Sequence, residues 1–361
     1  MKLPKQLIEK LQERKEDNSF RSLHIYPDGV DFFSNDYLGA AKRISTRVGK
    51  EGSTGSRLIS GNSERTLAIE AELATFFDSP SALFFNSGYD ANLGFFSCVP
   101  QKGDTVIYDQ LVHASIRDGI RMGVARSYSF AHNNITELKK KITRAEGNVY
   151  VVVESLYSMD GDQADLIAIS AICEEVGAYL VVDEAHSGGV YGEKGKGMVY
   201  AEGLQQKVFA RLITFGKAYG SHGAIVLGGD ELKDFLVNFS RPLIYTTALS
   251  PLLQERLVDV VGQVAKMDKE RQKLFENIQL FRAEARAHNL ALIDSESAIQ
   301  AILISGNTKA LNCAKILNNK GYNVKAILSP TVPKGEERIR ICLHSFNSEA
   351  DIRGLIKTLH G

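Results

Sequence analysis

The sequence has few cysteines, no excess of charge of either sign and no long apolar run. Its four cysteines are far apart and form no C-x-x-C pair, which argues against a disulfide framework or a structural zinc site. The 43 basic residues balance the 43 acidic ones, so charge does not favour binding to nucleic acid. No stretch reaches the length of a membrane span, and the N-terminus lacks the apolar core of a signal peptide. We therefore expect a cytoplasmic protein that does not bind membranes.

The chain does contain enough apolar residues, 44% of its 361, to bury a substantial interior. Between about residues 65 and 229, short apolar runs alternate with helical periodicity. Runs buried on both faces and separated by helices predict an α/β fold with a mostly parallel sheet covered on two sides. The strand-like runs are SALFFNSG, DTVIYD, ARSYSFAH, NVYVVVES, AYLVVDEAH, RLITFGKA and GAIVLGG. The helical stretches are 65–78, 88–97, 113–122, 134–145 and 165–177.

The rest of the chain predicts a second, smaller unit. Residues 4–17 have the pattern of a short amphipathic helix, and about 251–290 form a long charged helical stretch that suits a connector. Short strands and helices then alternate to the C-terminus. These patterns predict an N-terminal segment (1–45) that packs with the small domain, a large domain (46–255) and a small C-terminal α/β domain (256–361).

Polar residues follow several of the predicted strands directly. Ligands of open parallel sheets bind beyond the carboxyl ends of the strands, so we expect a site where these segments meet. The segments are Asn86–Tyr89, Ser155–Asp160, Asp183–His186 and Thr214–Lys217.

Asp183 and Lys217 offer the chemistry of an imine-forming site. Asp183 ends a buried strand, where it is either a cap or loop acid or the counter-charge of a buried cation such as a protonated pyridine nitrogen. His186, three residues on, could face the same cavity. Lys217 is either a surface charge or, among the small residues of TFGKAYG, a partly buried amine that forms an imine.

Three further segments have both a structural and a functional interpretation. FFNSGYDAN (84–92) runs from a strand into a helix, whose N-terminus can seat a phosphate. His113 is either a helix-start residue or a ring that stacks on a flat heterocycle. Arg338 and Arg340 alternate along one strand and are either solubilising residues or a clamp for a carboxylate.

Taken in order, nine stretches resemble the α-oxoamine synthase family of fold-type-I pyridoxal-phosphate enzymes. They are SNDYLG (34–39), GSTGSRLISGN (52–62), FFNSGYDAN (84–92), VHASIRDG (112–119), ESLYSMDGD (154–162), VVDEAHSGGVYG (181–192), TFGKAYGSHGA (214–224), IYTTALSP (244–251) and RIRICL (338–343). The resemblance implies an aspartate-aminotransferase-like fold, with a mostly parallel seven-stranded sheet between helices in the large domain and a smaller C-terminal α/β domain.

The resemblance also implies a role for each residue at the pyridoxal-phosphate ring. Lys217 would form the imine with the cofactor, and Asp183 would pair with the ring nitrogen. His186 and Ser158 would hydrogen-bond the ring hydroxyl, and His113 would stack on the ring face. The catalytic residues would be Lys217, His113, Asp183 and His186, and no metal is implied.

Residues at the phosphate would include Ser87, Gly88, Tyr89 and Thr214. Thr246 or Thr247 would reach the phosphate of a neighbouring subunit, which implies a homodimer with shared active sites.

The substrate carboxylate would bind Asn35 and Arg340, with Arg338 as the less favoured clamp.

The family joins an amino acid to an acyl thioester, on coenzyme A or acyl carrier protein, and releases carbon dioxide. IYTTALSP and TFGKAYGSHGA are most like members that use L-alanine and a pimeloyl thioester in biotin synthesis. Members that join glycine to acetyl-CoA come next, and Arg57-Leu58 argues against the 5-aminolevulinate-forming members. An aminotransferase or aldol-cleaving enzyme, and a binding protein or reductase without imine chemistry, remain alternatives.

Overall fold

A computed structural model describes residues 12–13, 15–18, 29–40 and 52–360 of the chain. The predicted helix at 4–17 lies mostly outside these residues. The chain divides into two compact units. The larger contains Leu38–Tyr157 and Gln163–Asp268, and the smaller contains the residues up to Tyr37, Ser158–Asp162 and Lys269–Gly361. The domain boundaries after residues 45 and 255 stay a prediction.

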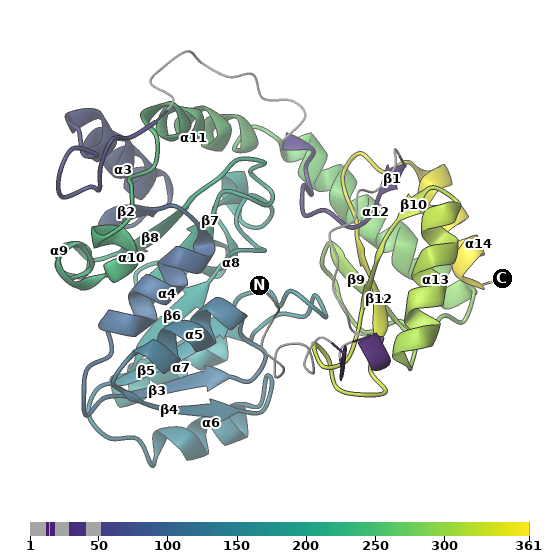
Figure 1. The fold of residues 1–361 in the computed structure, drawn as a ribbon, viewed down its shortest axis with the longest axis horizontal. Helices are drawn as coiled ribbons and strands as arrows, with labels where there is room; N and C mark the ends of the chain where they lie inside the picture. The colour runs from purple at the N-terminus through teal and green to yellow at the C-terminus, as the bar shows by residue number, and fades with distance from the viewer. Residues whose placement is uncertain (1–11, 14, 19–28, 41–51, 361) are drawn as a thin grey trace, which may run out of the picture. The chain divides into compact units, whose positions relative to one another are not determined.

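The larger unit is built on a seven-stranded sheet with the order β2-β8-β7-β6-β5-β3-β4 (Figure 1). Its strands are β2 (Ser81–Phe85), β3 (Thr105–Asp109), β4 (Arg126–Phe130), β5 (Val149–Glu154), β6 (Tyr179–Asp183), β7 (Ala210–Thr214) and β8 (Ala224–Gly228). β8 runs antiparallel to both of its neighbours, and every other neighbouring pair is parallel. All seven predicted strands are confirmed. Most are apolar runs that suit a sheet covered on both faces, whereas the edge strand β4 is largely exposed.

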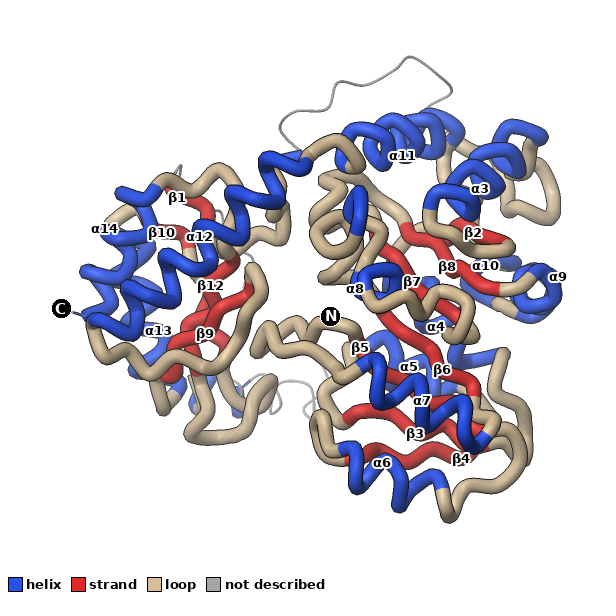
Figure 2. Tube along the Cα trace, turned by 180° about the vertical axis from the view of Figure 1, so that it is seen from behind, coloured by secondary structure: helices blue, strands red, loops and turns tan. Residues whose placement is uncertain are grey.

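Helices cover both faces of this sheet. Helices α4 (Gly88–Cys98) and α5 (Ala114–Met122) lie on one face, whereas α7 (Leu166–Val176) lies on the other (Figures 1 and 2). The remaining helices of the unit are α3 (Glu64–Phe76), α6 (Ile135–Ile142), α8 (Met198–Ala201), α9 (Asp230–Phe239), α10 (Arg241–Ile244) and α11 (Pro251–Val264). Ser63, Ser87, Asn134 and Asp165 each cap a helix by accepting a backbone N–H in its first turn, which fixes where that helix begins.

The smaller unit carries two small sheets. One is antiparallel with the order β11-β12-β9, and the other pairs two strands in parallel, β1 with β10. Its elements are β1 (Val30–Asp31), α12 (Asp268–Ala287), β9 (Ile299–Leu303), α13 (Asn307–Asn319), β10 (Tyr322–Asn323), β11 (Lys325–Ile327), β12 (Arg338–Cys342) and α14 (Glu349–His360). Because β1 pairs with β10, this part of the N-terminal segment completes a sheet whose other strand comes from the C-terminal region.

Two sequence expectations need correction. The helical stretch at 251–290 is two helices, α11 and α12, because α11 ends in tight turns from Gln263 to Lys266 and from Val264 to Met267. The break itself, 265–267, contains no proline or glycine, although Gly262 precedes it in the last turn of α11. The segment NVKAILSP contributes to two separate short strands, β10 and β11, rather than to one strand.

Within the part of the chain that the structure describes, no helix combines the length and apolarity that a bilayer span requires.

Candidate active site

One cavity of about 170 Å³ lies at the carboxyl ends of the parallel strands in the larger unit. Its lining residues lie at the ends of five strands, β2, β3, β5, β6 and β7, or in the segments that follow them. They are Gly88, Tyr89, Asn92, His113, Ser115, Glu154, Asp183, Ala185, His186, Thr214 and Lys217. Seven of the predicted site residues therefore surround a single space, as the strand-end rule predicts.

Asp183 is a buried carboxylate at the last position of β6, with 6% of the residue exposed. One oxygen accepts the backbone N–H of Ala185 at 2.8 Å, and the other accepts the amide of Asn92 at 2.7 Å. Each oxygen of the carboxyl therefore receives an N–H donor, an arrangement that suits a carboxylate. The result is a fixed negative charge on the cavity wall.

Lys217 brings an amine to the same cavity. Its Nζ lies 2.7 Å from Nε2 of His186, the residue that follows the β6 strand end by three positions. Lys217 comes from the turn after β7, the strand next to β6 in the sheet. The adjacent strand ends thus place an amine, an imidazole and a carboxylate on one cavity.

His113 is held by a chain of hydrogen bonds that leads back to Asp183. Its Nδ1 lies 2.8 Å from the hydroxyl of Ser115, which accepts the Asn92 amide at 3.1 Å. Asn92 also donates to Asp183, as described above. Burial and the nearby positive charge of Lys217 lower the pKa of His113, so its ring is neutral at neutral pH. A neutral ring that accepts at Nδ1 carries its proton on Nε2.

The first turn of α4 forms another wall of the cavity. Ser87 is its N-cap and accepts the backbone N–H of Asp90 at 3.0 Å. Gly88 lies against the end of β7, since a Cβ on it would lie 3.4 Å from Cβ of Thr214. The Tyr89 hydroxyl donates to Asp118, outside the helix. Backbone N–H groups at such a turn suit an anion.

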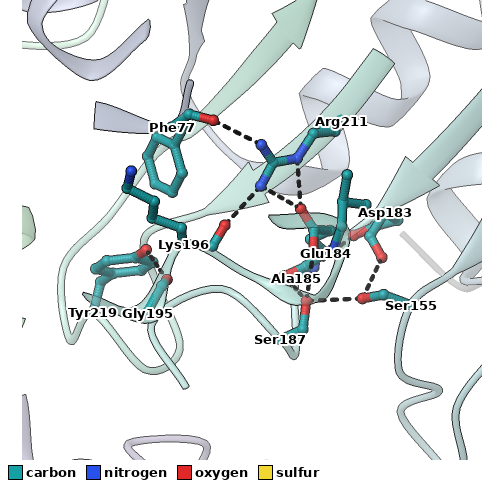
Figure 3. Close-up of polar contacts among 11 residues, drawn as sticks. Phe77, Ser155, Asp183, Glu184, Ala185, Ser187, Gly195, Lys196, Arg211 and Tyr219 are labelled. Carbon is teal, nitrogen blue, oxygen red and sulfur yellow. Dashed lines mark hydrogen bonds and ion pairs between the residues drawn. The ribbon is translucent and has the colours of Figure 1, made fainter. Parts of the chain in front are cut away.

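A second buried charge cluster lies directly behind the β6 strand end (Figure 3). The Glu184 carboxylate accepts Arg211 Nε at 2.7 Å and the Ser187 hydroxyl at 3.1 Å. Arg211 also donates to the carbonyls of Phe77 and Lys196, at 2.9 and 2.6 Å. These contacts tie the loop after β6 to β7 and so fix the backbone that carries Asp183 and His186.

Thr246 and Thr247 do not line the cavity. The Asn86 amide donates to the Thr246 hydroxyl at 3.3 Å and to the Thr247 carbonyl at 2.9 Å. The Thr247 residue is exposed, and Thr246 is half-buried.

The remaining predicted residues form a separate cluster inside the smaller unit. Arg340 donates to the Ser158 carbonyl at 2.7 Å and to Oδ1 of Asn35 at 3.1 Å. Arg338 instead pairs with the carboxylate of Asp160 and, at 3.4 Å, with that of Glu336. Arg338 is therefore paired with two carboxylates, whereas Arg340 has no carboxylate partner among the described residues.

Three polar lining residues, Asn92, Ser115 and Glu154, were not singled out from the sequence. All three fall within quoted stretches, FFNSGYDAN, VHASIRDG and ESLYSMDGD. For Glu154 a signal existed, because it ends the apolar run VYVVV just as Asp183 ends YLVV. Asn92 follows Gly88 by four residues, which places it one helical turn further along the same face of α4.

The fold and the strand-end cavity define a known class of protein. A family model described as aminotransferase class I and II matches residues 27–359, and the chain belongs to this family. A relative from Emericella nidulans named 8-amino-7-oxononanoate synthase is 36% identical, covering 98% of this chain and 94% of the relative. A relative of the same name from Marinobacter nauticus is 39% identical, covering 91% and 86%.

Solved structures have the same fold. Serine palmitoyltransferase from Sphingomonas wittichii aligns with a TM-score of 0.88 and 26% identity, covering 99% of this chain and 96% of that one. An 8-amino-7-oxononanoate synthase from Francisella tularensis aligns with a TM-score of 0.81 and 27% identity, covering 92% and 97%. A further neighbour, with a TM-score of 0.87, 26% identity and coverage of 99% and 96%, is described as SPT with its PLP internal aldimine. These likenesses confirm the predicted fold type.

Proposed function

We propose that this chain is a pyridoxal-phosphate-dependent acyltransferase that joins L-alanine to a pimeloyl thioester, releases carbon dioxide and forms 8-amino-7-oxononanoate. One observation carries the proposal: Lys217 and Asp183 face one cavity in a chain that is 36–39% identical to relatives of that name. For the site residues we propose the roles that the family resemblance implies, as given in the sequence analysis.

The residues of the cavity fit pyridoxal phosphate. The cofactor needs a counter-charge for its ring nitrogen, an amine for its aldehyde and donors for its phosphate. Asp183, Lys217 and the first turn of α4 with Thr214 supply these three functions in one space. In addition, Oδ1 of Asn92 is buried and has no hydrogen-bond partner among the described residues, so the cavity wall leaves polar capacity open for a ligand.

When bound, the cofactor supplies an electron sink that stabilises negative charge at the α-carbon of an amino acid. Asp183 holds positive charge at the ring nitrogen, which strengthens that sink. Lys217 acts as the base that takes the α-proton, and His186, 2.7 Å away, orients its amine. His113 offers a neutral ring, and the chain through Ser115 and Asn92 fixes its orientation.

We propose Arg340 as the residue that binds the substrate carboxylate. It is a buried cation, 9% exposed, whose partners are a backbone carbonyl, an amide oxygen, a thiol and Tyr37. A buried guanidinium is best balanced by a carboxylate, and its planar fork suits two parallel hydrogen bonds. Arg338 already has this arrangement with Asp160 and is the weaker candidate.

We propose a homodimer in which Thr246 and Thr247 reach the neighbouring subunit. The loop that follows residue 52 hydrogen-bonds the segment after Thr247, because Ala248 donates its N–H to the Gly55 carbonyl. This region exposes large apolar side chains, with Ile59 84% and Tyr245 73% exposed, which is typical of a surface that another chain covers. Sedimentation of the cofactor-loaded protein measures the oligomeric state, and a monomer at micromolar concentration contradicts the proposal.

We also propose a cytoplasmic location, since none of the cysteines forms a disulfide, which suits a reducing compartment.

The deciding experiment crosses a panel of thioesters with a panel of amino acids and measures the free thiol released. Pimeloyl, acetyl and palmitoyl thioesters of coenzyme A are each combined with L-alanine, glycine and L-serine. Release with the alanine and pimeloyl pair supports the proposal. Release with glycine and acetyl-CoA, or with serine and the palmitoyl thioester, would give this chain a different activity within the same class of acyltransferases. No release with any pair contradicts acyl transfer altogether.

A further inference from the structure

Glu154 is a second buried carboxyl in the cavity, and the proposed chemistry assigns it no role. It ends β5 and is the register partner of Asp183 at the end of β6, so the two acids occupy matching positions on neighbouring strands. The residue is 3% exposed and lines the same cavity as Lys217. Two carboxyls at adjacent strand ends, closed off from water, repel each other if both are ionised.

The hydrogen bonds distinguish these two acids. Asp183 accepts two N–H donors, from Asn92 and Ala185. Glu154 accepts a hydrogen bond from the backbone of His113, while its Oε1 is buried and has no partner in the described part of the chain. The acid with more donors is the better anion, so the negative charge belongs to Asp183 and the proton to Glu154.

The charged groups that face Glu154 agree with this assignment. Asp183 and Asp109 repel its ionised form, whereas Lys217 favours it. Asp109 is already engaged by His132 at 2.9 Å and by the N–H of Leu111 at 2.8 Å. Burial, followed by the charge of Asp183, raises the pKa of Glu154 to about 8.

Glu154 also closes a ring of polar contacts around the cavity. From its carboxyl the ring passes to the backbone of His113, and from the His113 ring to Ser115, Asn92 and Asp183. β5 and β6 then join Asp183 back to Glu154. A substitution of Glu154 therefore affects both the backbone that carries the His113 side chain and the electrostatic environment of Asp183.

We propose that Glu154 is a positioning residue that stands beside Asp183 as a neutral carboxylic acid, leaving Asp183 the fixed negative charge while its carboxyl holds the backbone of His113. This role rests on the proposed function, because the ring nitrogen of the cofactor is the cation that Asp183 would serve. The charge assignment itself is a property of the chain and is testable without cofactor.

The first test is infrared spectroscopy of the cofactor-free protein, which distinguishes the carbonyl stretch of a carboxylic acid from that of a carboxylate. We expect an acid band at pH 6 that weakens as the pH rises through about 8. Glu154→Gln removes this band, whereas Glu202→Gln, at an exposed position, leaves it in place. An acid band that persists in Glu154→Gln, or no acid band at pH 6, overturns the assignment.

The second test uses the visible absorption of the bound cofactor. Above pH 8 an ionised Glu154 stabilises positive charge in the cavity, so in Glu154→Gln the pH midpoint of the absorption change moves down. Glu154→Ala also loses the contact to His113, and we expect it to lower kcat/KM for the amino acid by about tenfold more than Glu154→Gln does. Equal losses in the two variants, or an unmoved midpoint, contradict the positioning role. The midpoint stays measurable if the thioester panel fails, so the two proposals fail separately.

Discussion

Asp183 and Glu184 are neighbours in the sequence and are both buried, yet their side chains lie in two different kinds of polar region. Glu184 points into the cluster with Arg211, where the carboxylate receives an ion pair at 2.7 Å and further donors from Ser187 and Val199 (Figure 3). Asp183 lines the cavity, where Oδ1 of Asn92 and Oε1 of Glu154 have no hydrogen-bond partner among the residues that the structure describes.

The difference separates a structural cluster from a ligand site. A buried ion pair is tolerable when the chain itself supplies its partners, and the cluster around Glu184 meets that condition. A site prepared for a ligand leaves charge and hydrogen-bonding capacity open, because the ligand supplies the last partners. Substitutions of residues that line the cavity should therefore reduce activity, and substitutions in the Glu184–Arg211 cluster should reduce stability.

The largest effect is expected for Lys217→Ala. It removes the amine that would serve as nucleophile and base, so turnover should fall by on the order of 10⁴-fold or more. Because the residues that line the cavity contribute little to stability, the thermal unfolding midpoint should stay close to that of the original chain. Lys207→Ala, at an exposed lysine paired with Glu174, is the matched control and should retain full activity. Wholesale unfolding of Lys217→Ala would mean that Lys217 is structural.

Asp183→Asn tests the fixed charge at nearly constant shape. Loss of the counter-charge weakens the electron sink, and we expect kcat to fall on the order of 10³-fold. Steady-state kinetics at several pH values measure this, with circular dichroism as the check on folding. A variant that keeps kcat within a few-fold would show that the cavity does not depend on this carboxylate.

Glu184→Gln, one residue further along the chain, should reduce stability rather than activity. It leaves Arg211 buried without its counter-charge, which costs about 3–5 kcal/mol of unfolding free energy. Glu174→Gln breaks an exposed pair with Lys207 and should cost less than about 1 kcal/mol. Urea unfolding of the two variants compares them. If Glu184→Gln were as stable as Glu174→Gln, the cluster would have no structural role.

The two arginines of β12 extend the comparison to the smaller unit. Arg340→Lys removes the planar fork from the cation that lacks a carboxylate partner among the described residues, so KM for the amino acid should rise about 10- to 100-fold. Arg338→Lys keeps a cation beside Asp160 and should change KM less. KM for the thioester serves as the internal control. The same rise in both variants would argue against Arg340 as the specific clamp.

The last prediction concerns the pH dependence of stability in the cofactor-free protein. The folded-state pKa of Glu154, about 8, lies above its ordinary value of 4.5. Between these values the folded chain binds a proton that the unfolded chain has lost, so the free energy of unfolding falls as the pH rises. Glu154→Gln should flatten this slope in urea titrations from pH 5 to 9. An unchanged slope would mean that Glu154 is ionised throughout.

Much of the larger unit follows from the sequence, because most of its strands are short apolar runs bounded by polar or small residues. The ends of these runs also predicted the cavity, since the carboxyl ends of parallel strands meet at one edge of the sheet. The break between α11 and α12 was not predictable in this way. It occurs in Ala265–Met267, where no proline or glycine interrupts the helical pattern.

The sequence by itself determined the fold class, the strand ends that meet at the cavity and the residue types, an amine and a carboxylate, that these ends carry. Only the tertiary structure decided which polar group pairs with which. Arg338 meets Asp160 from 178 positions away, and Glu184 meets Arg211 from 27 positions away, so no local pattern records either contact. The reason is that periodicity reflects whether a position is buried, whereas hydrogen bonds and charge depend on neighbours that folding brings from distant parts of the chain.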